Sequence, residues 1–244
     1  MTGSRVALVT GGSRGIGAAI VRRLARDGMR VAFTYATKQD RAGQVVDEVA
    51  AGQGQALCLE ADVADPAAIA AAVERSVEVW GRLDVVVANA GVARAGGIDA
   101  LAAEDIDRMI DVNVRGVVHT IRAALPHLGD AGRIVTIGSV NAERTPFAGA
   151  AAYAMTKAAV AGLVRGLARD LGPRGITVNN VQPGPTANDS MSADGPAAQA
   201  MTKWLALPRI GAPEEIAALV AHLVGPEAAF ITGASLTIDG GLTA

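Results

Sequence analysis

The sequence is poor in cysteine and in aromatic residues. Its 244 residues include one cysteine, three phenylalanines, two tyrosines and two tryptophans. The lone Cys58 has no partner for an internal disulfide, which excludes a small secreted fold held by disulfides. No uninterrupted apolar run reaches the roughly 18–20 residues that span a bilayer, so we expect no membrane segment. Residues 1–12 lack a basic stretch followed by an apolar one, so we expect no signal peptide and a cytoplasmic location.

An excess of charge of one sign is also missing. The 22 Lys and Arg residues face 24 Asp and Glu residues, a net charge of −2. A protein that binds nucleic acid needs a basic face to neutralise phosphates, so we expect no nucleic-acid partner. The three histidines have no Cys, Asp or His at metal-ligand spacing, so we expect no metal site.

Glycine and small apolar residues are abundant, and short apolar runs alternate with segments of helical period. Most of the runs are continuously apolar, as expected for strands covered on both faces. The pattern predicts a doubly wound α/β fold with a parallel seven-stranded sheet, Rossmann-like, in a single domain over residues 1–244. The predicted strands are Val6–Thr10, Val31–Tyr35, Ala56–Glu60, Val85–Ala88, Arg133–Ile137, Ile176–Val181 and Ser235–Ile238. The predicted helices cover 16–24, Arg41–Ala51, Pro66–Trp80, Glu104–Leu128, Ala154–Leu171 and Pro213–Leu223.

One long stretch, Pro183–Leu207, is too rich in Pro, Gly, Asn, Asp and Ser to be a core element throughout. A long connection after a strand is more often functional than packed, so we expect a mobile substrate lid at about 185–207. It carries Met191, Met201, Trp204 and Leu205, which either close over a hydrophobic carbonyl compound or pack the lid onto the sheet.

A glycine-rich loop follows the first predicted strand and opens the first predicted helix. Glycines permit a tight turn and close backbone approach, and the free N–H groups of a helix N-terminus bind a pyrophosphate. The spacing of the glycines differs from the common G-x-G-x-x-G pattern. The prediction of a phosphate site therefore rests on the position of the loop between a strand and a helix. The predicted phosphate-binding residues are Gly11, Ser13, Arg14, Gly15, Ile16 and Gly17.

The end of the second predicted strand bears on the choice of cofactor. NAD-preferring sites place an acid there for the ribose 2′-hydroxyl, whereas this chain has Tyr35. Without a carboxylate to repel it, a 2′-phosphate can be held by Arg14 and Lys38. We therefore expect NADP, as NADPH, rather than NAD.

Four polar residues form a candidate catalytic set. Tyr153 and Lys157 are four residues apart, so both lie on one face of a helix. A free tyrosine has a pKa near 10, so it needs a nearby positive charge to exchange a proton at neutral pH. Ser139 follows an apolar strand at the carboxyl edge of the sheet, where α/β proteins bind ligands. Asn113 lies inside a helical segment, where an asparagine is unfavourable unless its side chain has a partner.

Over almost its whole length the chain resembles the short-chain dehydrogenase/reductase family. The resemblance rests on Thr10-Gly11-x-x-x-Gly15-x-Gly17, Asn89-Ala90-Gly91, Asn113, Ser139, Tyr153-x-x-x-Lys157 and Pro183-Gly184, in the order and spacing of the family. It implies a Rossmann-like fold, NAD(P)-dependent carbonyl and alcohol chemistry, and a homo-oligomer, a tetramer or a dimer.

The resemblance also implies roles for single residues. Tyr153 is the acid–base, and Lys157 binds the nicotinamide ribose and lowers the pKa of the tyrosine. Ser139 holds the substrate oxygen and Asn113 a relay water. Asp62 and Val63 contact the adenine, and Asn89, Ala90 and Gly91 line the cofactor cleft. Pro183 and Gly184 also belong to the expected cofactor-binding residues.

The chain departs from the family pattern at two places. Ala88 stands where many members have a first asparagine before Asn89. Asn188 stands where many members have a threonine that holds the nicotinamide carboxamide, so either Thr186 or Asn188 is expected to take that role.

The expected substrate is a small-molecule ketone or aldehyde, either a 3-oxoacyl thioester or a small hydrophobic carbonyl compound. The chain is similar to 3-oxoacyl-[acyl-carrier-protein] reductases, but the basic residues that an acyl carrier protein would need, Arg94, Arg144 and Lys203, are scattered. The alternative is a nucleotide-binding sensor with little or no reductase role. It rests on a resemblance of Ile137–Asn141, Gly166–Asp170 and Gly233–Ser235 to a bacterial branch with a cyclic-di-GMP-binding member. The full catalytic set favours the enzyme, because a pure binding module needs no proton relay.

Overall fold

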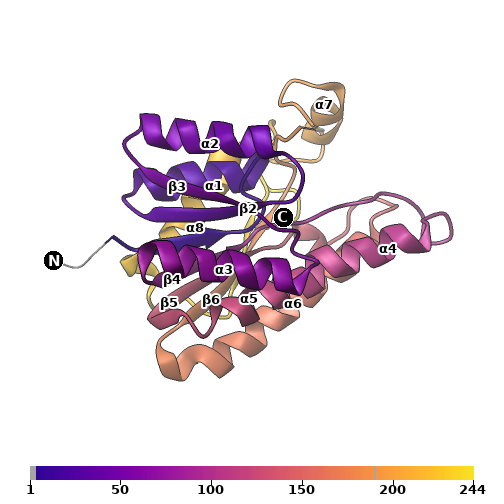
Figure 1. Ribbon diagram of the computed structural model, residues 1–244. Coiled ribbons are helices and arrows are strands. Elements are labelled where there is room, and N and C mark those ends of the chain that lie inside the picture. The colour runs from indigo at the N-terminus through magenta and orange to yellow at the C-terminus, as the bar shows by residue number, and fades with distance from the viewer. Residues whose placement is uncertain (1–3, 190) are drawn as a thin grey trace.

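The computed structural model describes residues 4–189 and 191–244, and within them seven strands pair in parallel in the order β3-β2-β1-β4-β5-β6-β7 (Figure 1). The predicted doubly wound α/β fold is therefore confirmed. Residues 1–3 and 190, which belong to the predicted domain and lid, lie outside the described residues. The strands are β1 Val6–Val9, β2 Arg30–Tyr35, β3 Gln55–Glu60, β4 Leu83–Ala88, β5 Leu128–Ile137, β6 Thr177–Pro183 and β7 Ser235–Ile238.

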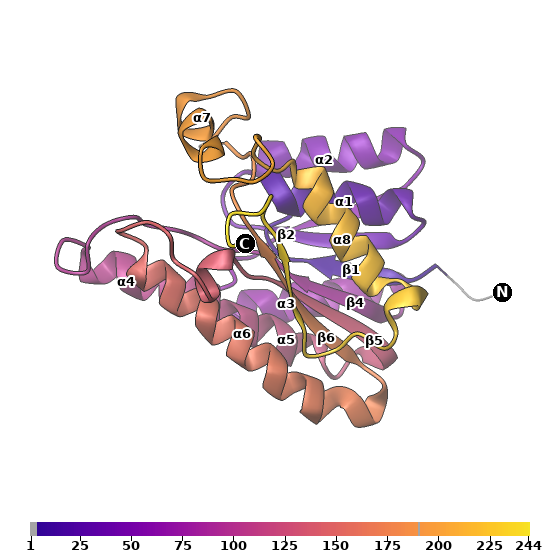
Figure 2. The same cartoon turned by 180° about the vertical axis from the view of Figure 1, so that it is seen from behind.

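Helices cover both faces of the sheet (Figures 1 and 2). One face carries α1 (Gly15–Arg26), α2 (Gln39–Ala51) and α8 (Pro213–Val224), and the other carries α3 (Pro66–Trp80), α5 (Gly116–Ala124) and α6 (Ala151–Leu171). Short helical turns join other elements: η2 (Val140–Ala142), η3 (Gly172–Arg174) and η4 (Pro226–Ala228). None of the helices in residues 4–189 and 191–244 has the length and apolar composition needed to cross a membrane.

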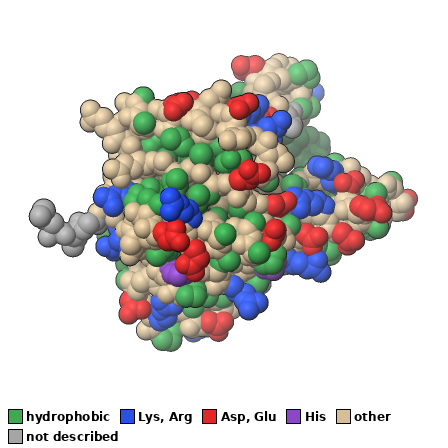
Figure 3. All heavy atoms as spheres, in the orientation of Figure 1, with side chains coloured by type: hydrophobic (Ala, Val, Ile, Leu, Met, Phe, Trp, Pro, Cys, Tyr) green, Lys and Arg blue, Asp and Glu red, His purple; other side chains and the backbone are tan. Residues whose placement is uncertain are grey.

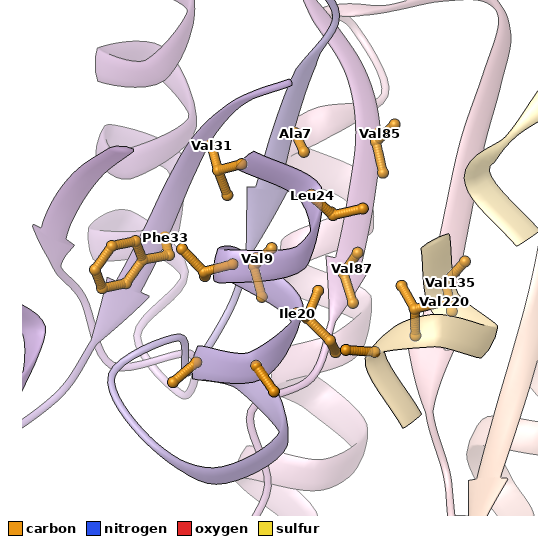
Figure 4. Close-up of a cluster of buried hydrophobic side chains, with 14 of the residues drawn as sticks. Ala7, Val9, Ile20, Leu24, Val31, Phe33, Val85, Val87, Val135 and Val220 are labelled. Atoms are coloured by element: carbon orange, nitrogen blue, oxygen red, sulfur yellow. The ribbon is translucent and has the colours of Figure 1, made fainter. Parts of the chain in front are cut away.

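The alternation of side chains along β1 shows why its whole run is apolar. Ala7 and Val9 pack into the cluster beneath α1 and α8, while Val6 and Leu8 pack into the cluster on the opposite face. Because successive strand residues point to opposite faces, a strand covered on both sides buries all of them. Figure 4 shows the first cluster, where Ile20 and Leu24 of α1 lie over the strands.

The strand order places a crevice at the carboxyl edge of the sheet. From β1 the chain runs outward through β2 to β3, and then returns to place β4 on the other side of β1. At such a switch point the loops after the two central strands part, and α/β proteins bind ligands there. The loops after β1, β4, β5 and β6 all open onto this edge.

The predicted helix over Glu104–Leu128 is wrong in two respects. It is divided into α4 (Ala103–Ile110), a π-helical turn η1 (Asp111–Arg115) and α5, and Leu128 already begins β5. Pro126 has no N–H to donate within a helix, which accounts for the early end of α5. Strand β5 begins at Leu128, five residues before the predicted start at Arg133, and the other predicted helices and strands agree with the structure to within three residues at either end.

Two segments project from the body of the molecule. The α4 helix and the loop before it form an arm, and the short helix α7 (Pro196–Thr202) stands above the carboxyl edge near the start of α2 (Figures 1 and 2). Figure 3 shows the surface recessed between these two projections. No helix was predicted within Pro183–Leu207, so α7 is an addition to the predicted elements. Proline at its N-terminus is tolerated there because the first N–H groups of a helix have no internal partner.

Candidate active site

The loop between β1 and α1 is shaped by its glycines. Gly11 and Gly15 have positive φ angles of 68° and 52°. A Cβ on Gly17 would lie 2.2 Å from the carbonyl oxygen of Gly11, and one on Gly12 would lie 2.6 Å from the Cβ of Phe33. A Cβ on Gly15 would meet nothing within 4 Å, so the loop is open on that side. The tight turn therefore depends on glycine at these positions.

The N-terminus of α1 is suited to an anion. Its N-cap residue Arg14 makes no capping hydrogen bond through its side chain, and the first turn contains no acid. Free N–H groups and the positive end of the helix dipole favour a phosphate at such a place. Ser13 is half-buried in the loop, and Ile16 packs onto the hydrophobic cluster beneath α1. These residues fit the pyrophosphate of a dinucleotide.

Asn89 and Thr10 join the loop to the end of β4. The Nδ2 of Asn89 donates to the carbonyl oxygens of Thr10 and Gly11 at 2.9 and 3.1 Å. The Oγ1 of Thr10 in turn accepts from the N–H groups of Asn89 and Ala90 at 3.0 and 3.1 Å. The two central strands are thus held together where they open onto the crevice.

The π-helical turn η1 presents Asn113 to this edge. Asn113 is fully buried and its Oδ1 accepts from the N–H of Val92 at 2.8 Å. Its Nδ2 donates to the carbonyl oxygen of Val92 at 2.8 Å and to the Oγ1 of Thr156 at 3.0 Å. A Cβ on Gly91 would lie 3.3 Å from the Oδ1 of Asn113 and 3.5 Å from the Nζ of Lys157. The side chain of Asn113 is therefore a clamp that holds the loop after Gly91 against the helix α6.

Tyr153 and Lys157 share one face of α6, as predicted. Lys157 is 5% exposed and its Nζ donates to the carbonyl oxygen of Ile137 at 2.8 Å. The Nζ lies 5.7 Å from the centroid of the Tyr153 ring. Burial lowers the pKa of Lys157 to about 8, so its charge titrates close to neutral pH.

Ser139 completes the set. It follows β5 by two residues, is 8% exposed, and accepts a hydrogen bond from the N–H of Asn141 at 3.2 Å. Burial raises the pKa of Tyr153, and a hydrogen bond with Ser139 works in the opposite direction. The structure thus brings Asn113, Ser139, Tyr153 and Lys157 to one end of the sheet. Burial is the larger of these two influences and raises the pKa of Tyr153, and the lowering by Lys157 that the resemblance implies stays a prediction.

The two residues predicted to contact the adenine, Asp62 and Val63, follow the end of β3. Val63 is buried, and the carboxylate of Asp62 accepts from the N–H of Ala64 at 3.0 Å and from Arg108 of α4 at 2.7 Å. Burial acts to raise the pKa of Asp62, but the hydrogen bond from Ala64 and the ion pair with Arg108 outweigh it and lower the pKa. Asp62 is therefore ionised and fixed in place.

The residues predicted for the 2′-phosphate differ in exposure. Tyr35 is 8% exposed and packs with the core, whereas Lys38 is exposed just before α2. The structure adds a cation that the sequence analysis missed, Arg41 in the first turn of α2. Arg41 and Arg14 both form ion pairs with Asp189. A cation at the start of an amphipathic helix looks like ordinary surface charge in a sequence, and only the fold brings it beside the phosphate loop.

The segment after β6 contains the residues expected at the nicotinamide end. Pro183 is the last residue of β6, and Gly184 follows it with its N–H donating to Ile238. Thr186 is 7% exposed and its Oγ1 donates to the carbonyl oxygen of Gly184 at 3.0 Å. The Nδ2 of Asn188 donates to the carbonyl oxygen of Thr186, and its Oδ1 accepts from the N–H of Met191. Thr186 and Asn188 thus both make hydrogen bonds within this segment, and the role of either at the nicotinamide carboxamide stays a prediction.

Metal ligands were not expected. In the part of the chain that the structure describes, no group of three or more His, Cys, Asp or Glu side chains is placed to hold a metal ion. His127, which directly precedes the start of β5, pairs with Glu74 of α3 at 3.0 Å.

A parallel sheet with a glycine loop after its first strand, and a serine, a tyrosine and a lysine at its carboxyl edge, defines the class of dinucleotide-binding α/β proteins. The family described as enoyl-(acyl carrier protein) reductase matches residues 11–243. A cyclic-di-GMP-binding biofilm dispersal mediator protein of Escherichia coli (strain K12) is 48% identical over 239 residues, which cover 98% of this chain and 97% of that protein.

Solved structures agree closely with this fold. A short-chain dehydrogenase/reductase from Serratia marcescens has a TM-score of 0.96 and 54% identity, with 98% of each chain covered. A short-chain dehydrogenase from Burkholderia cenocepacia, in complex with NADP, has a TM-score of 0.95 and 52% identity over 99% of this chain and 98% of that chain. The chain therefore belongs to the short-chain dehydrogenase/reductase family of oxidoreductases.

Proposed function

We propose that the protein is an NADPH-dependent reductase that converts a ketone or an aldehyde to an alcohol. The observation that carries the proposal is the arrangement of Ser139, Tyr153 and Lys157, which places a hydrogen-bonded phenol beside a buried ammonium at the carboxyl edge. A protein that only binds nucleotides has no use for a buried lysine behind a tyrosine, since burying a charge costs free energy.

The residues of this chain have separate tasks in the reaction. When bound, NADPH supplies a hydride to the carbonyl carbon. Ser139 and Tyr153 hold the carbonyl oxygen by hydrogen bonds, and the hydroxyl of Tyr153 gives its proton to that oxygen as negative charge develops there. The ammonium of Lys157 stabilises the phenolate that remains, because opposite charges attract strongly in a buried site. Asn113 fixes the position of α6, the helix that carries Tyr153 and Lys157. A relay water held by Asn113 stays a prediction.

The choice of NADPH over NADH rests on the charges beside the phosphate loop. The end of β2 offers no carboxylate to a ribose 2′-hydroxyl, and Arg14 lies next to the loop with Lys38 exposed nearby. Guanidinium and ammonium groups bind a 2′-phosphate by charge-assisted hydrogen bonds. The relative from Burkholderia cenocepacia that was solved with NADP supports the same choice.

The substrate is expected to lie between the loop before α6 and the segment that carries α7. The rings of Phe147 and Trp204 meet edge to face with their centroids 5.8 Å apart, and they join these two segments. An apolar boundary of this kind fits a small hydrophobic carbonyl compound or the acyl part of a 3-oxoacyl thioester. Arg94 pairs with Asp105 and Arg144 binds the carbonyl oxygen of Thr243, so neither offers a free cation to an acyl carrier protein.

The experiment that tests the proposal is consumption of NADPH by the purified protein over a panel of ketones, aldehydes and a 3-oxoacyl thioester. We expect turnover by the wild type and a loss of about three orders of magnitude or more in kcat for Tyr153→Phe, which keeps the ring but has no proton to give. The affinity for NADPH should not change. Turnover that survives in Tyr153→Phe would refute the mechanism.

A second candidate is a sensor of cyclic-di-GMP, favoured by the 48% identity to the Escherichia coli biofilm dispersal mediator protein. It predicts that the protein binds cyclic-di-GMP and reduces no carbonyl in the panel. Calorimetric titration with cyclic-di-GMP, in the presence and absence of NADPH, separates the two candidates.

The remaining features of the proposal concern the whole protein. We propose a single domain over residues 1–244 whose segment at about 185–207 closes over the substrate, a cytoplasmic location, and a homo-oligomer of two or four copies. Light scattering after size-exclusion chromatography measures the number of copies.

A further inference from the structure

Asp189 holds two arginines from different elements. One of its carboxylate oxygens, Oδ2, lies 3.8 Å from the Nη1 of Arg14 and is also hydrogen-bonded to the Nη1 of Arg41. Arg14 ends the phosphate loop, and Arg41 is the third residue of α2. One carboxylate oxygen of Asp189 thus contacts two guanidinium groups at the edge of the proposed dinucleotide site.

Asp189 itself comes from a distant part of the chain. It lies six residues after β6, in the segment that continues into α7, and Thr186 just before it pairs with Gly211. In both ribbon views α7 stands close to the start of α2 (Figures 1 and 2). The ion pairs therefore fasten the segment that carries α7 to the cofactor side of the crevice.

The two arginines are suited to a phosphate as well as to a carboxylate. Guanidinium groups bind both by charge-assisted hydrogen bonds, and a phosphate monoester carries more negative charge than a carboxylate. The side chains of Arg14, Arg41 and Asp189 are 56%, 45% and 44% exposed. Ion pairs with so much solvent contact are weak, so a doubly charged ligand can displace the carboxylate.

We propose that Arg41, together with Arg14, recognises the 2′-phosphate of NADP(H), and that Asp189 competes with this phosphate for the same two guanidinium groups. The inference rests on the proposed use of NADPH. Binding of a 2′-phosphate frees the segment that carries α7 from α2, whereas NAD(H), which has no 2′-phosphate, leaves the ion pairs in place. The 2′-phosphate of the cofactor then has two effects. It increases the affinity of the protein for the cofactor, and it releases the segment over the substrate.

The probes that test this are adenosine 2′,5′-bisphosphate and AMP, which share adenine, ribose and the 5′-phosphate and differ in the 2′-phosphate. Neither contains nicotinamide, so a response of the α7 segment cannot come from contacts at the nicotinamide end. Trp204 lies just after α7 and reports on that segment, and Trp80→Phe leaves it as the sole tryptophan. We expect the bisphosphate, but not AMP, to change the emission and anisotropy of Trp204.

Three variants in the Trp80→Phe background sharpen the test. Asp189→Asn removes the competing charge, so we expect the bisphosphate to bind about three- to tenfold more tightly, AMP to bind as before, and the Trp204 signal to lie near its ligand-bound value from the start. Asp194→Asn is the matched control: it removes the same charge from an exposed aspartate in the same segment that forms no ion pair in the described part of the chain. We expect no change for it. Arg41→Gln should weaken the bisphosphate about tenfold and leave AMP unaffected.

The outcomes separate this inference from the proposed function. If the wild type binds NADPH no better than NADH, the proposed cofactor is wrong, and the inference falls with it. If the wild type prefers NADPH but Trp204 responds equally to the bisphosphate and to AMP, or to neither, then Asp189 is no competitor and the inference alone is overturned. An equal gain in affinity for Asp189→Asn and Asp194→Asn would overturn it as well, since it would show only the general effect of a removed charge.

Discussion

Asn113 donates a hydrogen bond from its Nδ2 to the Oγ1 of Thr156 at 3.0 Å, and so joins the π-helical turn η1 to the catalytic helix α6. The same Oγ1 donates to the carbonyl oxygen of Tyr153 at 2.8 Å. Thr156 thus connects the clamp around Val92 to the backbone of Tyr153, the proposed proton donor. Turns of π-helix are rare and occur often at functional sites, because the extra residue turns a side chain inward.

Replacing this hydroxyl should therefore affect catalysis more than binding. We expect Thr156→Val to cost about 1–2 kcal/mol of stability, because it leaves a proton of the buried Asn113 amide without an acceptor. We also expect kcat to fall about tenfold with little change in the KM for NADPH, since the position of Tyr153 is loosened. Urea unfolding and steady-state kinetics measure the two effects.

The matched control is Thr120→Val. Thr120 is also fully buried, but its Oγ1 donates only to Gly116 in its own helix. We expect a similar or smaller cost in stability and an unchanged kcat. Equal losses of kcat in both variants would show that Thr156 has no particular role in placing Tyr153.

The phosphate loop makes a prediction about glycine. A Cβ at Gly17 would stand 2.2 Å from the carbonyl oxygen of Gly11, so Gly17→Ala must displace the loop. We expect a loss of about 1–3 kcal/mol in stability, as for other overpacked sites, and a large loss of NADPH affinity. Gly43→Ala, within α2 and with nothing within 4 Å of its added Cβ, should instead stabilise the protein by about 0.5–1 kcal/mol. Thermal unfolding and a titration with NADPH test both; unchanged NADPH affinity in Gly17→Ala would contradict the structure.

Lys157 should lower the free energy of unfolding of the protein, although the proposed reaction depends on it. Burial lowers its pKa from 10.5 to about 8, so the unfolded chain binds more protons between these values and stability rises with pH through this window. We therefore expect Lys157→Met to be inactive yet more stable by roughly 1–2 kcal/mol at pH 7, where the buried ammonium is charged. The gain should shrink as the pH rises from 8 toward 10.5.

Urea unfolding at pH 7 and at pH 10 measures this difference, with the exposed Lys203→Met as the control. A Lys157→Met protein that is less stable than the wild type at pH 7 would show that the hydrogen bond to Ile137 outweighs the cost of burying the charge.

Glu215 should also make stability rise with pH, but in the acidic range and, unlike Lys157, by stabilising the folded protein. Two hydrogen bonds from Arg209, at 2.7 Å each, and one from the N–H of Ala212, at 2.8 Å, lower its pKa from 4.5 to about 2. Because the folded pKa is the lower one, the stabilisation is present above pH 4.5 and is lost as the pH falls toward 2. Both groups are largely exposed, so we expect Glu215→Gln to cost only about 0.5–1 kcal/mol at pH 7, and less at pH 3.5. Its neighbour Glu214→Gln serves as the control in urea unfolding at the two pH values, and equal costs for the two variants would contradict the prediction.

The sheet could be predicted from the sequence because burial on both faces leaves one signal, a continuous apolar run. Each predicted strand overlaps the observed one, with β7 identical in its bounds. The break at η1 could not be predicted, because the chain there keeps a helical period through Asn113. The position of η1 is explained by the hydrogen bonds of the Asn113 side chain with Val92 and Thr156, and both of these residues are distant from Asn113 in sequence.

The candidate catalytic positions could be proposed from the sequence because residues with chemical functions follow strands or share a helix face, which local patterns record. Arg41 was missed for a physical reason. Its place beside Arg14 depends on how α2 packs against α1, and its partner Asp189 lies 148 residues away. Thr10 and Thr156 were missed as hydrogen-bonding residues for the same reason, since a threonine in a strand or helix carries no sign of what its hydroxyl will meet.

The contact between Phe147 and Trp204 has a consequence for anyone who alters the substrate range of this protein. The two rings come from segments on opposite sides of the proposed substrate region, and they meet edge to face. Replacing one ring by a smaller side chain leaves the other ring without its partner. The vacated volume is then open to solvent as well as to substrate. Libraries that vary the two positions jointly will therefore sample usable shapes that successive single substitutions do not reach.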